Sequence, residues 1–123
     1  HCTLHEGVIA AVQGLTSARV QAAAHAARQA LTLLGVTQPR LCVLGINPHA
    51  GEGGLFGDED EHITRPAVQA LQALRAQHPQ HSLVASVPPQ LVLALELQQL
   101  GLSQERWYLI EHLRFVTWLN QIK

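Results

Sequence analysis

The chain has 123 residues, a formal net charge of −1 and one lysine, Lys123. This length suits one domain with a modest core, and a chain without a basic face is not expected to bind nucleic acid or a membrane surface. Cys2 and Cys42 are the only cysteines, and there is no membrane-length apolar run or signal-peptide pattern, so we expect a cytoplasmic protein without a disulfide scaffold.

The amino-terminal third predicts a strand end, a short helix and a long helix. Residues 1–4 could end a strand with His5 just beyond it, and residues 7–15 could form the short helix. Thr16 or Ser17 then caps a helix that runs to about residue 34, with Gly35 just after its end. One apolar stripe marks the buried face of this helix: Val20, Ala24, Ala27, Leu31 and Leu34.

A buried strand is predicted over residues 41–46, after the break at Pro39. The order strand, helix, strand implies parallel pairing through a crossover, and ligands of open α/β sheets lie at the carboxyl ends of the strands. His5 and His49 both follow such ends, so this topology would bring two imidazoles to one edge of the sheet. Cys42 falls inside the strand, where a buried thiol that acts as a small hydrophobic group is expected.

A second helix is predicted after the glycines that follow this strand. Asp58 and Glu61 fit a capping-box variant at its start, and the acidic run between them suits a helix amino terminus. Pro66 lies in the first two turns and could kink the helix, and His78-Pro79 ends it. Its buried face is marked by Ile63, Ala67, either Ala70 or Leu71, and Leu74.

From about residue 80 to the end, the pattern changes to a helical tail. Pro88 and Pro89 could start a third helix that stops at Gly101, and Ser103 caps a fourth that continues to the end of the chain. The aromatic residues of this tail suit a core or an oligomer contact: Trp107, Tyr108, Phe115 and Trp118. We therefore predict a single α/β domain over residues 1–123, with a partial parallel sheet, crossover helices and a C-terminal helical hairpin.

The stretch from Gly45 to Gly57 reads GINPHAGEGGLFG, which is typical of a ligand-binding loop after a buried strand. His49 stands just past the strand end, where a rigid scaffold can aim its side chain at a ligand. Glu52 could orient the His49 imidazole or be solvated. Glycines permit positive φ and close backbone approach, so main-chain N–H groups could meet a phosphate or carboxylate at Gly51, Gly53, Gly54 and Gly57. The pattern is neither a dinucleotide fingerprint nor a P-loop.

This loop closely resembles the signature of the 4-hydroxythreonine-4-phosphate dehydrogenase family, which acts in pyridoxal phosphate biosynthesis. The resemblance covers about residues 1–77. It extends backwards through Thr3-Leu4-His5-Glu6, Leu15-Thr16 and Leu33-Leu34-Gly35-Val36, and forwards from Asp60 to Leu71. These flanking residues look more like the branch that oxidises cis-dihydrodiols of terephthalate-type aromatic acids.

The resemblance implies a dehydrogenase that acts on a small molecule, with NAD as the hydride acceptor. It also implies a divalent metal (Zn, Mg or Co), held by three histidines across a dimer interface, which would polarise the substrate hydroxyl. His5 matches the first metal ligand and His49 the second, whereas the third has no match, because His112 lies in a predicted helix unlike the family motif. We therefore expect a homo-oligomer that oxidises a secondary hydroxyl of 4-phosphohydroxythreonine or of an aromatic-acid cis-dihydrodiol.

The tail does not fit this family, which should supply a strand and a His-Asp-Gln-Gly segment there. The substrate-binding half and the carboxyl-terminal nucleotide region are also missing, so we expect a fragment that is inactive as this chain alone. An alternative is a non-catalytic α/β module that self-associates through its aromatic C-terminal hairpin. A rearranged chain is a further possibility, since a chain that begins at His1 and contains no Met indicates a processed, excised or engineered piece.

Overall fold

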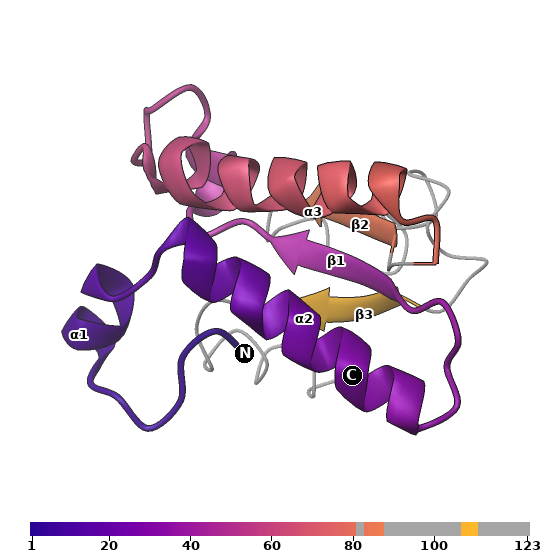
Figure 1. The fold of residues 1–123 in the computed structure, drawn as a ribbon. Coiled ribbons are helices and arrows are strands. Elements are labelled where there is room, and N and C mark those ends of the chain that lie inside the picture. The colour runs from indigo at the N-terminus through magenta and orange to yellow at the C-terminus, as the bar shows by residue number, and fades with distance from the viewer. Residues whose placement is uncertain (81–82, 88–106, 111–123) are drawn as a thin grey trace, which may run out of the picture.

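The computed structural model describes residues 1–80, 83–87 and 107–110, in which helices and parallel strands form a mixed α/β fold (Figure 1). One sheet contains the strands in the order β2 (Leu83–Val87), β1 (Arg40–Leu44) and β3 (Trp107–Ile110). Both neighbours pair with β1 in parallel, so that Leu41 lies opposite Val84 on one side and Tyr108 on the other. The carboxyl ends of the strands therefore share one edge of the sheet, at the left in Figure 1.

Three α-helices and two short helical turns complete the described part of the chain. In chain order they are α1 (Val8–Gln13), α2 (Ser17–Leu33), the 3₁₀ turn η1 (Pro48–Gly51), the π turn η2 (Asp60–Thr64) and α3 (Arg65–Gln77). The path from β1 through α3 to β2 is the long crossover that parallel neighbours need. None of the helices in these ranges is long and apolar enough to span a membrane.

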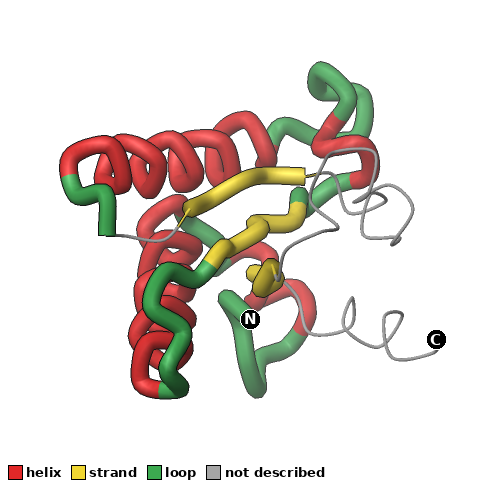
Figure 2. The backbone as a smooth tube through the Cα atoms, turned by 90° about the vertical axis from the view of Figure 1, so that its right-hand side faces the viewer, coloured by secondary structure: helices red, strands yellow, loops and turns green. Residues whose placement is uncertain are grey.

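The hydrophobic core lies between β1 and the two longer helices, which pack beside the sheet (Figure 2). Leu41 and Val43 point to the same face of β1, because side chains alternate along a strand. They form one cluster with Val20 of α2 and Ala67 of α3. Helices α2 and α3 also contact each other, so both cover this face of the sheet. All four residues from Leu41 to Leu44 are buried, as is typical of the central strand of a parallel sheet.

The caps predicted for α2 are confirmed. The Thr16 hydroxyl accepts the Arg19 N–H at 3.1 Å at the start of the helix. At its end, Gly35 has a φ of 89° and donates to the Thr32 carbonyl, while Val36 donates to the Leu31 carbonyl at 2.9 Å. This pair of bonds is a Schellman motif, in which glycine takes the left-handed position without steric cost.

The predicted stripe of α2 is confirmed except at its last member. Val20 and Ala24 are buried, and Ala27 and Leu31 pack against the core. Leu34 is 79% exposed, because the helix has already ended there and the chain turns away from the sheet.

The predicted strand at residues 1–4 is wrong, since this segment has no regular secondary structure. It is held instead by Arg19 of α2, whose Nε donates to the Cys2 carbonyl at 2.8 Å, and both Cys2 and Thr3 are buried. The strand predicted at 41–46 is confirmed as β1, which ends at Leu44. The strand–helix–strand unit of this fold is therefore β1–α3–β2.

The second helix begins in a different way from the prediction. The capping box of Asp58 and Glu61 is wrong, because the chain forms the π turn η2 there and the residue before it makes no side-chain cap. Asp58 instead faces His62, at 3.3 Å between Oδ2 and Nε2. The wide turn leads directly into the first turn of α3, where Pro66 has no N–H to donate.

The buried face of α3 agrees with the predicted stripe. Ala67 and Leu71 are buried, and Ile63, in the turn before α3, packs against the core. Ala70 is exposed, so Leu71 is the residue that contributes to the core at this position. The helix ends at Gln77, where the sequence predicts its end.

The predicted helical tail is wrong wherever the structure describes it. Residues Leu83–Val87 form strand β2, and Trp107–Ile110, inside the predicted fourth helix, form strand β3. Tertiary pairing overrides the local helical pattern here, because the buried backbone of β1 needs partners on both sides. The rest of the predicted hairpin, residues 88–106 and 111–123, lies outside the described residues.

Replacement of Thr16 by alanine removes the oxygen that accepts the Arg19 N–H. We expect the free energy of unfolding to fall by about 1 kcal/mol, the usual cost of a lost helix N-cap. Urea denaturation followed by circular dichroism would measure it. Thr37→Ala, in the exposed loop after α2, is the matched control and should leave stability unchanged. Equal stability of the two variants would contradict the capping role.

Both thiols should be unreactive in the folded chain. Burial raises the pKa of Cys42 to about 11, and it also raises the pKa of Cys2. Because the thiolate is the reactive form, we expect neither cysteine to be labelled by a thiol reagent at pH 7, and both to be labelled after denaturation. Mass spectrometry would count the labels. Modification of the native chain at either site would show that its thiol is accessible.

Candidate functional site

The loop after β1 has an unusual backbone at the residue expected to bind a ligand. His49 and Ala50, both in η1, have a φ of 52°, in the left-handed region. Residues other than glycine rarely adopt this region, and they keep it only where their surroundings hold them there. Both residues are exposed. The fold therefore constrains the backbone of His49 while its side chain stays accessible to a ligand.

The glycines let this loop close on itself. The Gly51 carbonyl accepts the N–H of Gly54 at 3.0 Å and that of Phe56 at 3.1 Å, and Gly54 and Gly57 form an isolated antiparallel bridge. A Cβ at Gly51 would lie 2.5 Å from the Gly57 carbonyl oxygen, so only glycine fits there. The N–H groups of Gly54 and Phe56 already donate to the Gly51 carbonyl. An anion that bound these two N–H groups would therefore have to displace hydrogen bonds of the loop itself.

An aromatic ring lies beside His49. The centroid of the Phe56 ring is 6.0 Å from that of the imidazole, and the two planes are inclined by 35°. Glu52 and Gly53 lie at the exposed tip of the loop, where both have positive φ. Orientation of the imidazole by Glu52 stays a prediction.

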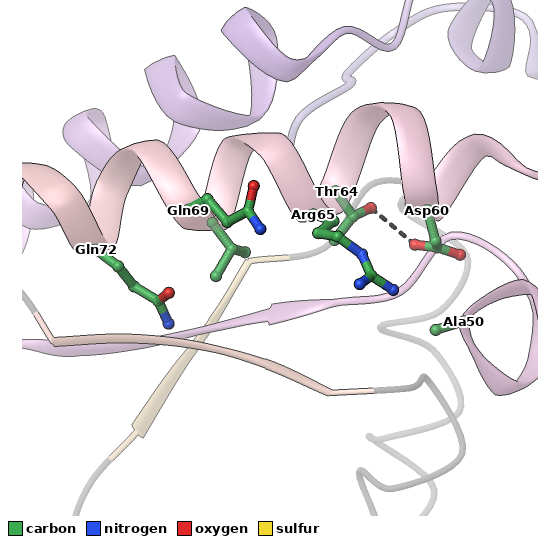
Figure 3. Close-up of a pocket in the computed structure, with 7 residues that line it drawn as sticks. Ala50, Asp60, Thr64, Arg65, Gln69 and Gln72 are labelled. Atoms are coloured by element: carbon green, nitrogen blue, oxygen red, sulfur yellow. Dashed lines mark hydrogen bonds between the residues drawn. The ribbon is translucent and has the colours of Figure 1, made fainter.

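Two consecutive carboxylates hold the start of the loop. Asp60 is buried, and its Oδ1 accepts the Ile46 N–H at 2.7 Å while its Oδ2 accepts the Asn47 N–H at 2.8 Å. The hydroxyl of Thr64, one turn later, donates to Oδ1 at 2.8 Å (Figure 3). The Asn47 side chain donates to Glu59 Oε2 at 2.5 Å. These bonds tie the end of β1 to the start of the following helix.

The sequence pattern did not predict the role of these two carboxylates, Glu59 and Asp60. The Glu59 carboxylate accepts hydrogen bonds from the backbone N–H of Glu59 and from the Asn47 amide. These bonds hold the pKa of Glu59 below its usual value, so this group is ionised at neutral pH. An acidic run before a helix is explained equally well by the helix amino terminus, which hid the separate role of Asp60. One signal for this role was available in the sequence. The backbone N–H groups that follow a buried strand need hydrogen-bond acceptors, and a nearby acidic side chain can supply them.

A cleft of about 320 Å³ opens along α3 beside this loop. Its walls include Ala50 of the loop, Asp60 and Thr64 of η2, and Arg65, Gln69 and Gln72 of α3. Figure 3 shows the α3 side chains below the helix, with Ala50 on the facing loop. Arg65 pairs with Glu61 at 2.8 Å, and both side chains remain more than half exposed. The cleft therefore offers a guanidinium and two amides close to the loop that carries His49.

His5 lies in an exposed turn before α1, with a φ of 57°. Arg19 holds the chain on both sides of it. The guanidinium donates to the Cys2 carbonyl before His5 and pairs with the Glu6 carboxylate after it. It also donates to the Gly14 carbonyl at 3.4 Å. One partly buried cation thus organises the segment that contains the second candidate histidine.

Both histidine-bearing segments lie beyond the carboxyl ends of the strands, but in separate places. In Figure 1 the loop is above β1 and the segment before α1 is below it, both at the left. Within the residues that the structure describes, no group of three or more His, Cys, Asp or Glu side chains is arranged to hold a metal ion. A catalytic zinc needs three protein ligands, so this part of the chain could supply only some of them.

A family comparison agrees with the sequence resemblance and extends it. The family model described as "Pyridoxal phosphate biosynthetic protein PdxA" matches residues 1–96. This range reaches beyond the residues 1–77 expected from the sequence and includes strand β2. The strand that the resemblance implied is therefore present.

Curated relatives match a little over half of the chain. A 1,2-dihydroxy-3,5-cyclohexadiene-1,4-dicarboxylate dehydrogenase of Comamonas sp. is 54% identical over 72 residues, which are 58% of this chain and 23% of the relative. A 4-hydroxythreonine-4-phosphate dehydrogenase of Beijerinckia indica is 44% identical over 73 residues, which are 59% of this chain and 20% of the relative. The matched region is thus less than a quarter of each relative's length.

Solved structures are similar to this chain, and the comparison covers almost all of its length. The 4-hydroxythreonine-4-phosphate dehydrogenase of Klebsiella pneumoniae has a TM-score of 0.76 and 29% identity, covering 99% of this chain and 34% of that protein. A terephthalate 1,2-cis-dihydrodiol dehydrogenase from Burkholderia xenovorans LB400 has a TM-score of 0.70 and 32% identity, covering 94% of this chain and 33% of that protein. The agreement of loop sequence, family match and fold shows that the chain belongs to the PdxA family of pyridoxal phosphate biosynthetic proteins.

Proposed function

We propose that this chain is part of a dehydrogenase that oxidises a secondary hydroxyl, with NAD as the hydride acceptor and a divalent metal as the Lewis acid. The observation that supports this most is the family match, which contains the His49 loop and the His5 segment. The chain alone is inactive in this proposal, because the described residues offer two candidate metal ligands, His5 and His49, and no group of three.

The substrate in this proposal is a small molecule that carries both hydroxyl and anionic groups. The names of two relatives specify a dihydroxycyclohexadiene dicarboxylate and a phosphorylated hydroxythreonine. The higher identity to the first, 54% against 44%, favours an aromatic-acid cis-dihydrodiol over 4-phosphohydroxythreonine. The cleft beside the loop offers polar partners for such a substrate, since the Arg65 guanidinium, two amides and the Asp60 carboxylate line it.

The metal, whether Zn, Mg or Co, would polarise the substrate hydroxyl and stabilise the charge that develops on its oxygen. His5 and His49 are its proposed ligands in this chain. Both side chains belong to exposed residues, and each lies in a segment that neighbouring charged groups hold in place. The remaining ligand comes from outside the described residues, and the complete enzyme is proposed to be a homo-oligomer.

A metal titration of the 123-residue chain tests the two histidines. A ligand that binds only the native state stabilises it by about 2.7 kcal/mol at a free concentration one hundred times its dissociation constant. We expect Zn²⁺ to raise the melting temperature and to give a calorimetric binding isotherm. His49→Ala and His5→Ala should each weaken or abolish both signals.

His25→Ala is the control, because His25 lies on α2, away from both candidate segments. It should leave the Zn²⁺ affinity unchanged. Binding that is absent, or that persists in both the His49→Ala and the His5→Ala chains, would show that these histidines do not form a metal site.

A further inference from the structure

We propose that Asp60 is a positioning residue: its buried carboxylate fixes the backbone at Ile46 and Asn47 and thereby sets the His49 imidazole where a divalent metal can use it. This inference rests on the proposed function of His49. Asp60 accepts hydrogen bonds from two consecutive backbone N–H groups, those of Ile46 and Asn47. Asp60 is 5% exposed, and its two bonds to the backbone are partly buried.

The oxygens of Asp60 are occupied by protein donors. Oδ1 accepts from the Ile46 N–H at 2.7 Å and from the Thr64 hydroxyl at 2.8 Å, and Oδ2 accepts from the Asn47 N–H at 2.8 Å. Hydrogen bonds to an ionised carboxylate are shorter and stronger than those between neutral groups. Asp60 therefore acts through the backbone that it binds.

The two bonded N–H groups lie at the point where β1 has ended and the loop begins. Ile46 and Asn47 follow the strand that ends at Leu44, and their N–H groups turn to Asp60. Pro48 comes next, and its ring restricts the backbone between Asn47 and His49. Asp60 therefore binds the backbone of the two residues directly before Pro48 and His49.

Asn47 is also held through its side chain. Its amide donates to Glu59 at 2.5 Å, and Gly57 leaves the space that this contact needs. A Cβ at Gly57 would lie 2.3 Å from Glu59 Oε2 and 2.9 Å from Asn47 Nδ2. The backbone and side chain of one residue are therefore bound by two adjacent carboxylates.

This double attachment accounts for the left-handed backbone of His49. A non-glycine residue in that region is strained and relaxes unless its surroundings hold it. If the bonds at Asn47 are lost, we expect His49 and Ala50 to return to ordinary backbone angles, which would move the imidazole. The immediate consequence would be a weaker metal site in a chain that is still folded.

The test compares Asp60→Asn with Asp58→Asn in the intact 123-residue chain. Asparagine at position 60 keeps one acceptor oxygen and places an NH₂ donor against a backbone N–H. Asp58, by contrast, is exposed and pairs with the exposed His62 side chain. Loss of a residue that orients a metal ligand usually costs 10- to 100-fold in affinity. We expect Asp60→Asn to weaken Zn²⁺ binding by about tenfold or more, and Asp58→Asn to leave it unchanged.

Two further measurements separate positioning from general destabilisation. Amide hydrogen exchange by NMR should accelerate at Ile46 and Asn47 in Asp60→Asn, while the amides of β1 stay protected. Leu71→Ala, which removes a buried side chain from α3, should lower the melting temperature yet keep the wild-type Zn²⁺ affinity at a temperature where the chain is folded. If Asp60→Asn does not fold, Thr64→Val removes one bond to Oδ1 and should weaken binding by about threefold.

The outcomes distinguish this inference from the proposed function. If the wild-type chain binds Zn²⁺ through His49 and neither Asp60→Asn nor Thr64→Val changes the affinity, the positioning role is refuted and the metal site stands. Unchanged exchange at Ile46 and Asn47 in Asp60→Asn refutes it as well. If the wild-type chain does not bind Zn²⁺ through His49, the proposed function fails and the inference fails with it.

Discussion

The carboxylate of Asp60 is the contact on which the candidate site depends. It joins the end of the central strand to the turn that starts the next helix, through bonds to Ile46, Asn47 and Thr64. A buried strand that stops inside a protein leaves N–H groups that must find acceptors, because an unpaired buried donor is costly. Here one carboxylate side chain supplies those acceptors, and the same bonds define where the His49 loop begins.

A second charged side chain, that of Arg19, holds the amino-terminal segment in place. The Arg19 guanidinium reaches the Cys2 and Gly14 carbonyls and the Glu6 carboxylate, and so it organises a segment without regular secondary structure. Both candidate histidines are thus exposed residues in loops whose neighbours are fixed by buried or partly buried charges. This arrangement is typical of ligand-binding loops that a rigid scaffold must hold in place.

The family relationship gives these loops a chemical context. The chain covers 23% and 20% of two curated relatives, and the described part brings together no set of three metal ligands. The proposed function therefore assigns to it only one part of a site: a histidine loop, a second histidine segment and a polar cleft along α3. The self-associating helical hairpin, the alternative from sequence, loses its basis at Trp107–Ile110, because these residues are a strand.

Local patterns in the sequence determined α2 with its Thr16 and Gly35 caps, the buried strand β1, the core face of α3 and the loop that identifies the family. Each depends on residues close together in the chain, such as a cap, a stripe or a run of glycines. Only the tertiary structure decided that Leu83–Val87 and Trp107–Ile110 are strands and that Asp60 binds Ile46 and Asn47. Those features join residues far apart in sequence, and the free energy of pairing a buried backbone outweighs the local preference that a sequence pattern records.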